Sequence, residues 1–228
     1  MRALTLGLRA AGALALGAAV IDQLVWTIEK EASGGGNVGF AVVNFFSLFT
    51  IESSLLALTV LAMGLVLAVR PAWEPGWFGT ARAAATTFMV VTGVVFNVLL
   101  RDTGPGAAAV PWSNEVLHVA GPVIMLLDWL ISPATRPLPR WTLAWIAGFP
   151  IVWAVYTMLR GALATDPGTG VGWYPYPFLD PGTSANGYAS VALYVLSIAA
   201  MIALVGTGLV RLERHRSRGA VPARTSIP

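Results

Sequence analysis

Residues 83–100 read AAATTFMVVTGVVFNVLL, a run without a single charged side chain. A run of this length can cross the hydrocarbon core of a bilayer as one α-helix. The rest of the chain has the same character, because 56% of its 228 residues are hydrophobic and only 11% are charged. Soluble domains carry about 25% charged residues, so the composition argues against a soluble fold. We therefore predict an all-α, polytopic membrane protein.

Gly, Pro and charged residues divide the chain into six apolar runs. We predict six transmembrane helices, at about 3–27, 44–69, 83–101, 112–132, 141–161 and 187–210. They form a single domain over residues 1–210, and the basic segment 211–228 is predicted to be a disordered cytoplasmic tail. Arg9 interrupts the first run and no small-residue cleavage site precedes Asp22, so we expect this helix to be retained rather than removed as a signal peptide.

The basic residues indicate how the helices cross the membrane, because short loops rich in Lys and Arg stay in the cytoplasm. With both termini inside, the cytoplasmic side holds Arg2, Arg9, Arg70, Arg82, Arg136, Arg140, Arg211, Arg214, Arg216, Arg218 and Arg224. The opposite side keeps only Lys30, Arg101 and Arg160. We therefore predict a multi-pass protein of the cell membrane with cytoplasmic N- and C-termini.

The composition also limits the chemistry. The absence of cysteine excludes thiolate nucleophiles, disulfides and cysteine metal sites. The chain has two histidines, and because His215 lies in the tail, neither a histidine metal site nor bis-histidine haem ligation is expected. No phosphate- or dinucleotide-binding fingerprint occurs, so no cofactor is predicted. The cations are too few and too dispersed for a nucleic-acid surface, and nothing in the pattern specifies an oligomeric state.

Two polar residues lie at the same predicted depth. Thr50 and His118 each lie six residues into their helices, about 9 Å below the outer edge. Ionisable side chains within a span are costly and are therefore candidates for a site. Five of the six predicted helices carry further polar residues in the outer half of the membrane. These candidates are Asp22, Ser47, Glu52, Asn97, Asn114, Glu115, Tyr156 and Arg160. We expect these side chains to support a cavity around Thr50 and His118.

The helical period distinguishes some of these supporting residues. Ser47 falls on the helical face of Thr50, whereas Glu52 points about 160° away and is free for another contact. Asn114 and Glu115 lie one turn before His118, so either side chain could fix which imidazole nitrogen carries the proton.

Structural roles are the alternative reading of the same residues. A threonine in a membrane helix commonly donates to the carbonyl four residues earlier. Asp22 and Glu52 could form ion pairs with Arg101 or Arg160. Asp128 lies near the cytoplasmic end of its helix, close to the arginines of the following loop, and is expected to be an interfacial anchor.

An oxygen nucleophile is the option that remains without cysteine, and it needs an adjacent base. His118 is the only histidine at membrane depth, so a Thr50 hydroxyl beside it would form a nucleophile–base pair. The predicted reaction is acyl transfer to threonine followed by hydrolysis. A site in the outer half favours an amphiphilic ester that reaches it laterally from the lipid.

The segment Trp173–Asp180, WYPYPFLD, alternates aromatic residues with two prolines. Proline fixes φ and aromatic rings favour the headgroup region, so the segment predicts a stiff surface at the membrane interface. It could cover the opening of the polar cavity, with Tyr176 near its centre, or be an interfacial loop without a ligand.

Three short patterns occur in order along residues 44–180. They are Phe49-Thr50 at the start of a helix, Trp112-x-Asn114-x-x-x-His118, and Tyr176-Pro177-Phe178-Leu179-Asp180. In this respect the chain resembles the androgen-induced protein family, which includes the androgen-dependent TFPI-regulating protein and a bacterial branch of six-span proteins. Its animal members are transmembrane hydrolases of fatty acid esters of hydroxy fatty acids that use a threonine and a histidine.

The resemblance implies that Thr50 is the nucleophile and His118 the base, the same residues that the depth argument selects. It also implies a lipid or fatty-acyl ester substrate. The chain departs from the animal pattern at Glu115, where those relatives often carry histidine. The alternative function is a non-enzymatic lipid- or partner-binding membrane protein whose polar cluster only holds helices together. A proton-coupled transporter is less favoured, because no discontinuous helix pair is predicted.

Overall fold

The computed structural model describes residues 2–101, 110–132, 137–168 and 170–219. Within these ranges the chain is helical and has no β-strand. The helices are α1 (Arg2–Ser33), α2 (Val38–Phe46), α3 (Phe49–Val69), η1 (Pro71–Trp73), α4 (Phe78–Val95), η2 (Phe96–Leu100), α5 (Pro111–Glu115), η4 (Val116–Ala120), α6 (Gly121–Ile131), α7 (Thr142–Leu163), η5 (Pro177–Leu179) and α8 (Tyr188–Gly219).

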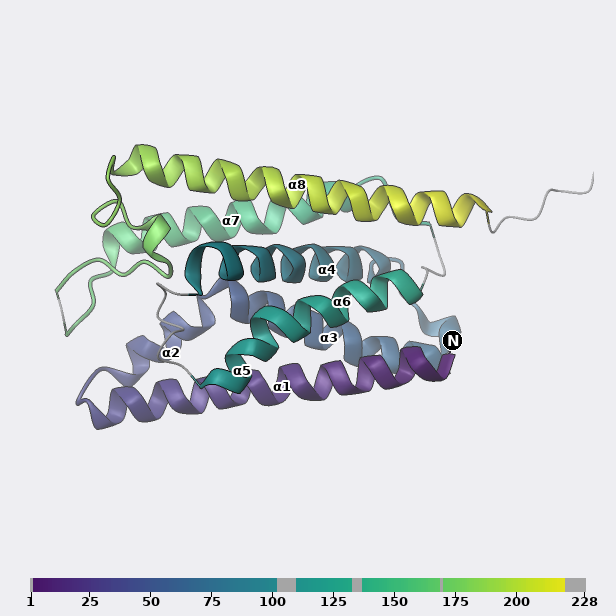
Figure 1. Cartoon of the computed structure of the whole chain (residues 1–228), viewed down its shortest axis with the longest axis horizontal. Coiled ribbons are helices and arrows are strands. Elements are labelled where there is room, and N and C mark those ends of the chain that lie inside the picture. Colours follow the sequence, from purple (N-terminus) through teal and green to yellow (C-terminus); the bar gives the residue numbers. More distant parts are fainter. Residues whose placement is uncertain (1, 102–109, 133–136, 169, 220–228) are drawn as a thin grey trace, which may run out of the picture.

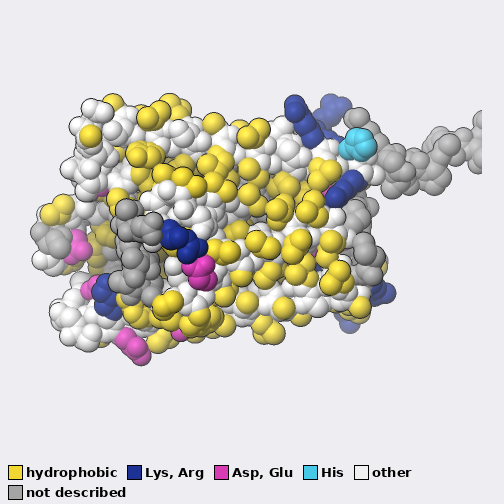
Figure 2. Space-filling view, in the orientation of Figure 1, with side chains coloured by type: hydrophobic (Ala, Val, Ile, Leu, Met, Phe, Trp, Pro, Cys, Tyr) yellow, Lys and Arg dark blue, Asp and Glu magenta, His cyan; other side chains and the backbone are white. Residues whose placement is uncertain are grey.

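Six helical stretches are long and apolar enough to cross a membrane, with α4–η2 and α5–η4–α6 each forming one continuous stretch. The prediction of an all-α chain with six such helices is therefore confirmed. The stretches lie side by side, and both ends of the described chain lie at the same end of the bundle (Figure 1). We call this the terminal end and the other the loop end. Hydrophobic side chains cover much of the face in Figure 2, and several Lys and Arg side chains gather at the terminal end.

Helix α4 is the centre of the bundle and the most buried of the six stretches. It packs against α3 and α6 on one side and against α7 and α8 on the other. Lipid is as apolar as these side chains, so the helices associate through close packing rather than through the hydrophobic effect. Gly121 shows how close this packing is, because a Cβ there would lie 2.8 Å from the side chains of both Leu16 and Met89.

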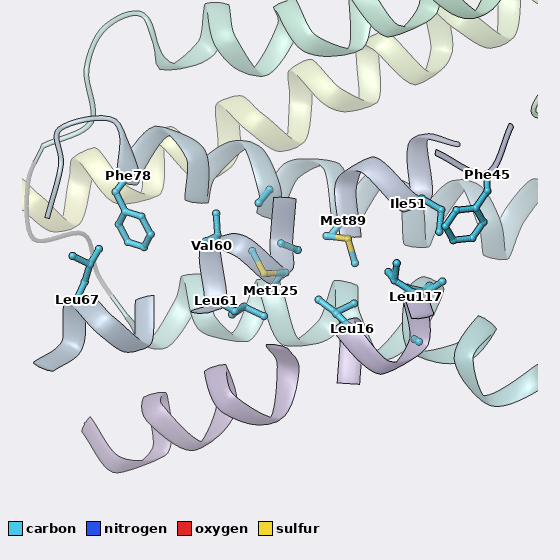
Figure 3. Packing of buried hydrophobic residues seen from close by; sticks show 14 residues of the cluster. Leu16, Phe45, Ile51, Val60, Leu61, Leu67, Phe78, Met89, Leu117 and Met125 are labelled. Carbon is cyan, nitrogen blue, oxygen red and sulfur yellow. The ribbon is translucent and has the colours of Figure 1, made fainter. Parts of the chain in front are cut away.

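Two clusters of buried apolar residues fill the bundle on either side of α4. The first joins α1, α3, α4, η4 and α6 and includes Leu16, Leu61, Met89, Leu117 and Met125 (Figure 3). The second joins α4, α6, α7 and α8 and includes Phe88, Trp129, Ile146, Ile202 and Leu209. The site described below lies near the loop end, beside the second cluster.

The predicted helix 44–69 is wrong at its start. Helix α2 ends at Phe46, and Ser47 and Leu48 separate it from α3. The reason is a contact with α7: Trp153 Nε1 donates to the Ser47 carbonyl over 3.0 Å, so this carbonyl is satisfied outside a helix. Thr50 therefore lies in the first turn of α3 rather than six residues into a longer helix.

Other boundaries also differ from the prediction. Helix α8 continues to Gly219, so residues 211–219, which we expected in a disordered tail, are helical. Residues 220–228 of the predicted tail lie outside the described residues. Helix α1 extends to Ser33, six residues beyond the predicted end, and stops before three glycines. Apolar content alone does not set these ends, because a helix can continue past the hydrocarbon region into water.

Candidate active site

Thr50 and His118 lie in direct contact, as the sequence predicts. Thr50 Oγ1 is 3.3 Å from His118 Nε2, although the two residues are 68 positions apart in the chain. Thr50 is only 8% exposed. The contact joins the first turn of α3 to η4, so it depends on the packing of two spans rather than on a local motif.

The other imidazole nitrogen assigns the tautomer of His118. Nδ1 lies 3.0 Å from the backbone carbonyl of Asn114. A carbonyl oxygen only accepts hydrogen bonds, so Nδ1 must carry the proton when the imidazole is neutral. Nε2 then presents its lone pair to Thr50, whose hydroxyl donates to it. This is the arrangement that a general base needs.

His118 is held in a π-helical turn, a feature that the sequence reasoning missed. The amide of Gly121 donates to Val116, five residues earlier. Pro122 has no N–H to donate to the carbonyl of His118, four residues before it. The side chain of Asn97 fills this gap, since its Nδ2 donates to the His118 carbonyl over 3.3 Å. Asn97 thus supports the backbone of the histidine rather than the reacting atoms.

A second π-helical turn lies opposite the first. It is η2, and its first residue, Phe96, stacks on the imidazole with a centroid separation of 3.8 Å and an interplanar angle of 17°. π-Helical turns are rare and occur often at functional sites. The stacking and the Nδ1 contact together limit rotation of the His118 ring, which keeps Nε2 directed at Thr50.

The first backbone N–H groups of α3 have no carbonyl acceptor within the helix. Leu48 occupies the N-cap position and offers no side-chain acceptor. The amide of Thr50 donates instead to Tyr176 Oη, over 3.3 Å. The same phenol oxygen lies 3.4 Å from Thr50 Oγ1. Tyr176 therefore contacts both the hydroxyl and the amide of the threonine.

Tyr176 belongs to the loop between α7 and α8, in the aromatic segment Trp173–Asp180. Its ring stacks on Phe178 with centroids 5.3 Å apart, and it also contacts Trp153. Burial raises the pKa of the Tyr176 phenol above its ordinary value, and the opposing effect of the donors from Thr50 is smaller. The phenol is thus neutral near pH 7 and keeps a proton to donate.

An apolar cavity of about 380 Å³ begins at these residues. Thr50 and Tyr176 belong to its lining, and most of the remaining wall is apolar and comes from α4, η2, α7 and α8. Along α7 it reaches from Leu143 to Met158, which corresponds to about 22 Å of helix. Ile151 lines the cavity yet is 61% exposed, so the cavity opens on the outer surface of the bundle, beside α7.

Ser47 and Tyr156 form a second polar contact next to the site. Ser47 Oγ lies 2.9 Å from Tyr156 Oη and donates to the Val43 carbonyl over 2.7 Å. One turn farther along α7, Arg160 donates to Asn44 Oδ1 over 2.6 Å. These contacts attach the α2–α3 connection to α7. They position the first turn of α3, and the residues do not reach the Thr50–His118 pair.

The remaining predicted residues have structural partners or lie apart. Asp22 accepts a hydrogen bond from Ser113 over 2.6 Å and so fixes the start of α5. Glu115 pairs with Arg101 over 2.7 Å, and it does not orient His118. The suggested pairing of Asp22 or Glu52 with Arg101 or Arg160 is therefore wrong for the described contacts.

Glu52 has a different environment. Its carboxyl is partly buried, and Oε2 has no hydrogen-bond partner among the described residues. It has no hydrogen bond with His118 in the described ranges, and its negative charge is close enough to Tyr176 to contribute to the raised pKa of that phenol. Asn114, for its part, contributes a backbone carbonyl to His118 instead of the side-chain contact that we considered.

Asp128 is the clearest correction to the sequence analysis. It is 1% exposed and accepts from Arg9 Nε over 2.6 Å and from Arg82 Nε over 3.0 Å. Arg82 also donates to the Ser132 carbonyl. We expected an anchor at the membrane interface. Instead, Arg9 and Arg82, which the sequence assigns to the cytoplasmic side, point into the bundle and neutralise this carboxylate. This ion-pair cluster lies toward the terminal end, away from the candidate site.

No protein-family model, curated protein or solved structure matches the chain. Among the described residues, no group of three or more His, Asp or Glu side chains could hold a metal ion. The chemistry of the site has to be argued from its own geometry.

Proposed function

We propose that the protein is an integral membrane hydrolase of lipid esters that uses Thr50 as nucleophile and His118 as base. The observation that carries this proposal is the 3.3 Å contact between Thr50 Oγ1 and His118 Nε2. A threonine hydroxyl is a weak nucleophile unless an adjacent base removes its proton. The carbonyl of Asn114, 3.0 Å from Nδ1, favours the tautomer in which Nε2 can do so.

The reaction would proceed in two steps. Thr50 Oγ1 attacks the ester carbonyl carbon while its proton passes to His118 Nε2, and the carbonyl π electrons move onto the oxygen. The tetrahedral intermediate collapses, the C–O bond to the alcohol breaks, and the leaving oxygen takes the proton from Nε2. Water then attacks the acyl-threonine with His118 again as base, which releases the acid and restores Thr50.

The cavity supports a substrate with a long apolar chain. Its wall is almost entirely apolar apart from Thr50, Tyr176 and two further threonines, so an acyl chain fits it better than a polar group. The exposed lining on α7 favours lateral access from the lipid. A fatty acid ester of a hydroxy fatty acid, the substrate type implied by the resemblance to the androgen-induced protein family, is our proposed substrate class.

The arrangement in the membrane follows from the basic residues. We place the terminal end of the bundle in the cytoplasm and the site in the outer half of the cell membrane. The chain has no cysteine, so single cysteines introduced at Ser217 and at Gly168 can report sidedness. In intact cells an impermeant maleimide should label only Gly168→Cys. Labelling of Ser217→Cys alone would invert the proposed orientation.

The competing function is a non-enzymatic lipid-binding protein, because an apolar cavity would also suit a lipid that is held rather than cleaved. The two functions separate in a labelling experiment with a fluorophosphonate probe on the purified protein in detergent. We expect the wild type to be labelled at Thr50, and Thr50→Ala and His118→Ala to lose both labelling and ester turnover. Thr59→Ala removes an exposed hydroxyl from the same helix and should behave as wild type.

Two outcomes would overturn the hydrolase. One is full labelling of Thr50→Ala, which would mean that another residue reacts. The other is a wild type that binds lipid esters, melts cooperatively and neither reacts with the probe nor turns over any ester in a panel of acyl lengths. Unchanged melting temperatures in both site variants are needed to read the loss as catalytic.

A further inference from the structure

Two side-chain groups lie within hydrogen-bond distance of Thr50 Oγ1, and the proposed mechanism uses only one of them. His118 Nε2 takes the proton and Oγ1 attacks, but Tyr176 Oη, 3.4 Å from Oγ1, has no assigned role. A buried phenol beside a nucleophile calls for an explanation, because a buried hydroxyl needs a partner for its own proton. The Thr50 amide donates to Oη, and this contact uses a lone pair of the oxygen, not its proton.

The position of Oη relative to Thr50 matches that of an oxyanion-hole donor. When Oγ1 bonds to the substrate carbon, the former carbonyl oxygen lies two bonds from Oγ1. Oη is within hydrogen-bond distance of both Oγ1 and the Thr50 amide, so an oxyanion in this space would lie close to two donors. Such donors act where negative charge develops, and their effect is large in a site from which water is excluded.

We propose that Tyr176 is a third catalytic residue, whose hydroxyl donates to the tetrahedral oxyanion together with the Thr50 amide. This inference rests on the proposed hydrolase function and adds a component that the Thr50–His118 pair lacks. The covalent step is unchanged: the π electrons of the carbonyl form the oxyanion, Oη–H donates to it without giving up its proton, and the contact is lost when the intermediate collapses.

The local structure suits this role. Tyr176 is fixed by stacking on Phe178 and by contact with Trp153, so little freedom remains for Oη to lose in the transition state. The Thr50 amide is available because the N-cap residue, Leu48, has no side-chain acceptor. In the structure this amide donates to Oη. The oxyanion would accept from both the amide and Oη–H.

The test is Tyr176→Phe, which keeps the aromatic ring and removes only Oη. We expect kcat for hydrolysis of a p-nitrophenyl acyl ester to fall by about 10²–10³-fold, as for the loss of one oxyanion donor, with little change in KM. Fluorophosphonate labelling of Thr50 should slow in parallel. Tyr174→Phe is the matched control, because Tyr174 belongs to the same loop but contacts Gly161 and Tyr188 instead of Thr50.

The outcomes separate this inference from the proposed function. If wild type is active, Thr50→Ala is inactive and Tyr176→Phe keeps wild-type kcat, the oxyanion role is wrong and the hydrolase stands. If Thr50→Ala is fully labelled, the hydrolase and this inference fall together. Binding of a non-hydrolysable ether analogue by Tyr176→Phe, with wild-type affinity, would show that the cavity is folded.

A second substitution covers the case in which Tyr176→Phe does not fold. Difluorotyrosine incorporated at position 176 keeps the shape of the residue but ionises at lower pH. If Oη must donate, kcat should be lost at lower pH than in the wild type, because the phenolate has no proton to give. An unchanged pH profile would overturn the proposal.

Discussion

Replacement of Asp128 by Asn tests how much the buried ion-pair cluster contributes to stability. The carboxylate is 1% exposed and lies between Arg9 and Arg82, two guanidiniums that come from α1 and α4. The amide of Asn is nearly the same size but carries no charge. The substitution therefore removes the charge with little change in volume, and leaves two cations facing a neutral group inside the bundle.

The expected loss is about 3–5 kcal/mol, the range for breaking a buried ion pair from one side. For a domain of this size it corresponds to a fall in melting temperature of about 6–20 °C. Asp128 lies ten residues beyond His118, about 15 Å along the helix. We therefore expect kcat, measured well below the melting transition, to remain unchanged.

The assay is thermal melting in detergent, followed by the fluorescence of the nine tryptophans. Glu115→Gln is the matched control, because it removes the same charge from an ion pair with Arg101 whose side chains are 40% and 49% exposed. Water screens that pair, so its loss should cost less than about 1 kcal/mol. A fall for Asp128→Asn no larger than that of the control would refute the reasoning.

Arg9→Met adds a second measurement on the same cluster. Alone it leaves Asp128 paired with Arg82. In the Asp128→Asn background it removes one of the two cations that have lost this carboxylate, while Arg82 keeps the attraction of the buried Glu213. The two substitutions should therefore be coupled, and the double variant should lose less stability than the sum of the single losses, by about 1–3 kcal/mol. Additive losses of stability would mean that Arg9 and Asp128 do not interact energetically.

Three further predictions concern the site. If His118 is the base, Gly93→Val should lower kcat by about 10–100-fold by displacing it, because a Cβ there would lie 3.0 Å from Pro122 and 3.2 Å from the His118 carbonyl. Wild-type kcat would contradict this. Ile202→Trp, which fills part of the cavity, should reduce kcat/KM for long-chain esters and spare short-chain ones, as a comparison of acyl lengths can show. Because burial raises the pKa of Tyr176, activity that depends on its proton should persist beyond the pH at which an ordinary phenol ionises and fall only at higher pH. Tyr176→Phe should lack this alkaline fall.

The sequence predicts the number of spans well because the signal is local. Each predicted helix rests on about 20 adjacent apolar residues, a length that suffices to cross the hydrocarbon core. The break between α2 and α3 at Ser47–Leu48, by contrast, depends on contacts with residues far away in the sequence. It depends on two residues of α7: Trp153 donates to the Ser47 carbonyl, and Tyr156 Oη lies 2.9 Å from Ser47 Oγ. The residues around the break therefore do not reveal it.

In the candidate site, too, the features set by local sequence are predictable and those set by contacts between helices are not. Predicted depth selects Thr50 and His118, although Thr50 lies in the first turn of α3 and not six residues into a helix. The contact between the two side chains comes from the packing of α3 against η4. The group that fixes the imidazole was not predictable from side-chain types, because it is the backbone carbonyl of Asn114 in a π-helical turn. That turn follows from Pro122 and is completed by Asn97 from another span. Pro122 was visible in the sequence, and a proline four residues after a candidate histidine is the signal that could have indicated it.

Counting the basic residues on each side of the membrane does not reveal which of them form buried ion pairs. The sequence assigns Arg9 and Arg82 to the cytoplasmic side, yet both bind Asp128 in the interior of the bundle. Position along the sequence placed them correctly near the terminal end. Only the packing of α1 against α6 and of α4 against α6 shows that they neutralise a carboxylate. Of the two loop arginines that we expected near Asp128, Arg140 has no hydrogen bond with it among the described residues, and Arg136 lies outside those residues.

The helix break also explains why Thr50 is available for chemistry. Hydroxyls farther along the spans donate to the carbonyl four residues earlier: Thr59 to Leu55 over 2.8 Å, and Thr86 to Arg82 over 2.9 Å. This bond is the structural alternative to catalysis for any membrane threonine. Thr50 lies in the first turn of α3, so the residue four positions earlier, Phe46, ends a different helix. The Thr50 hydroxyl instead contacts His118 and Tyr176, and the interruption between α2 and α3 thereby turns a structural hydroxyl into a candidate nucleophile.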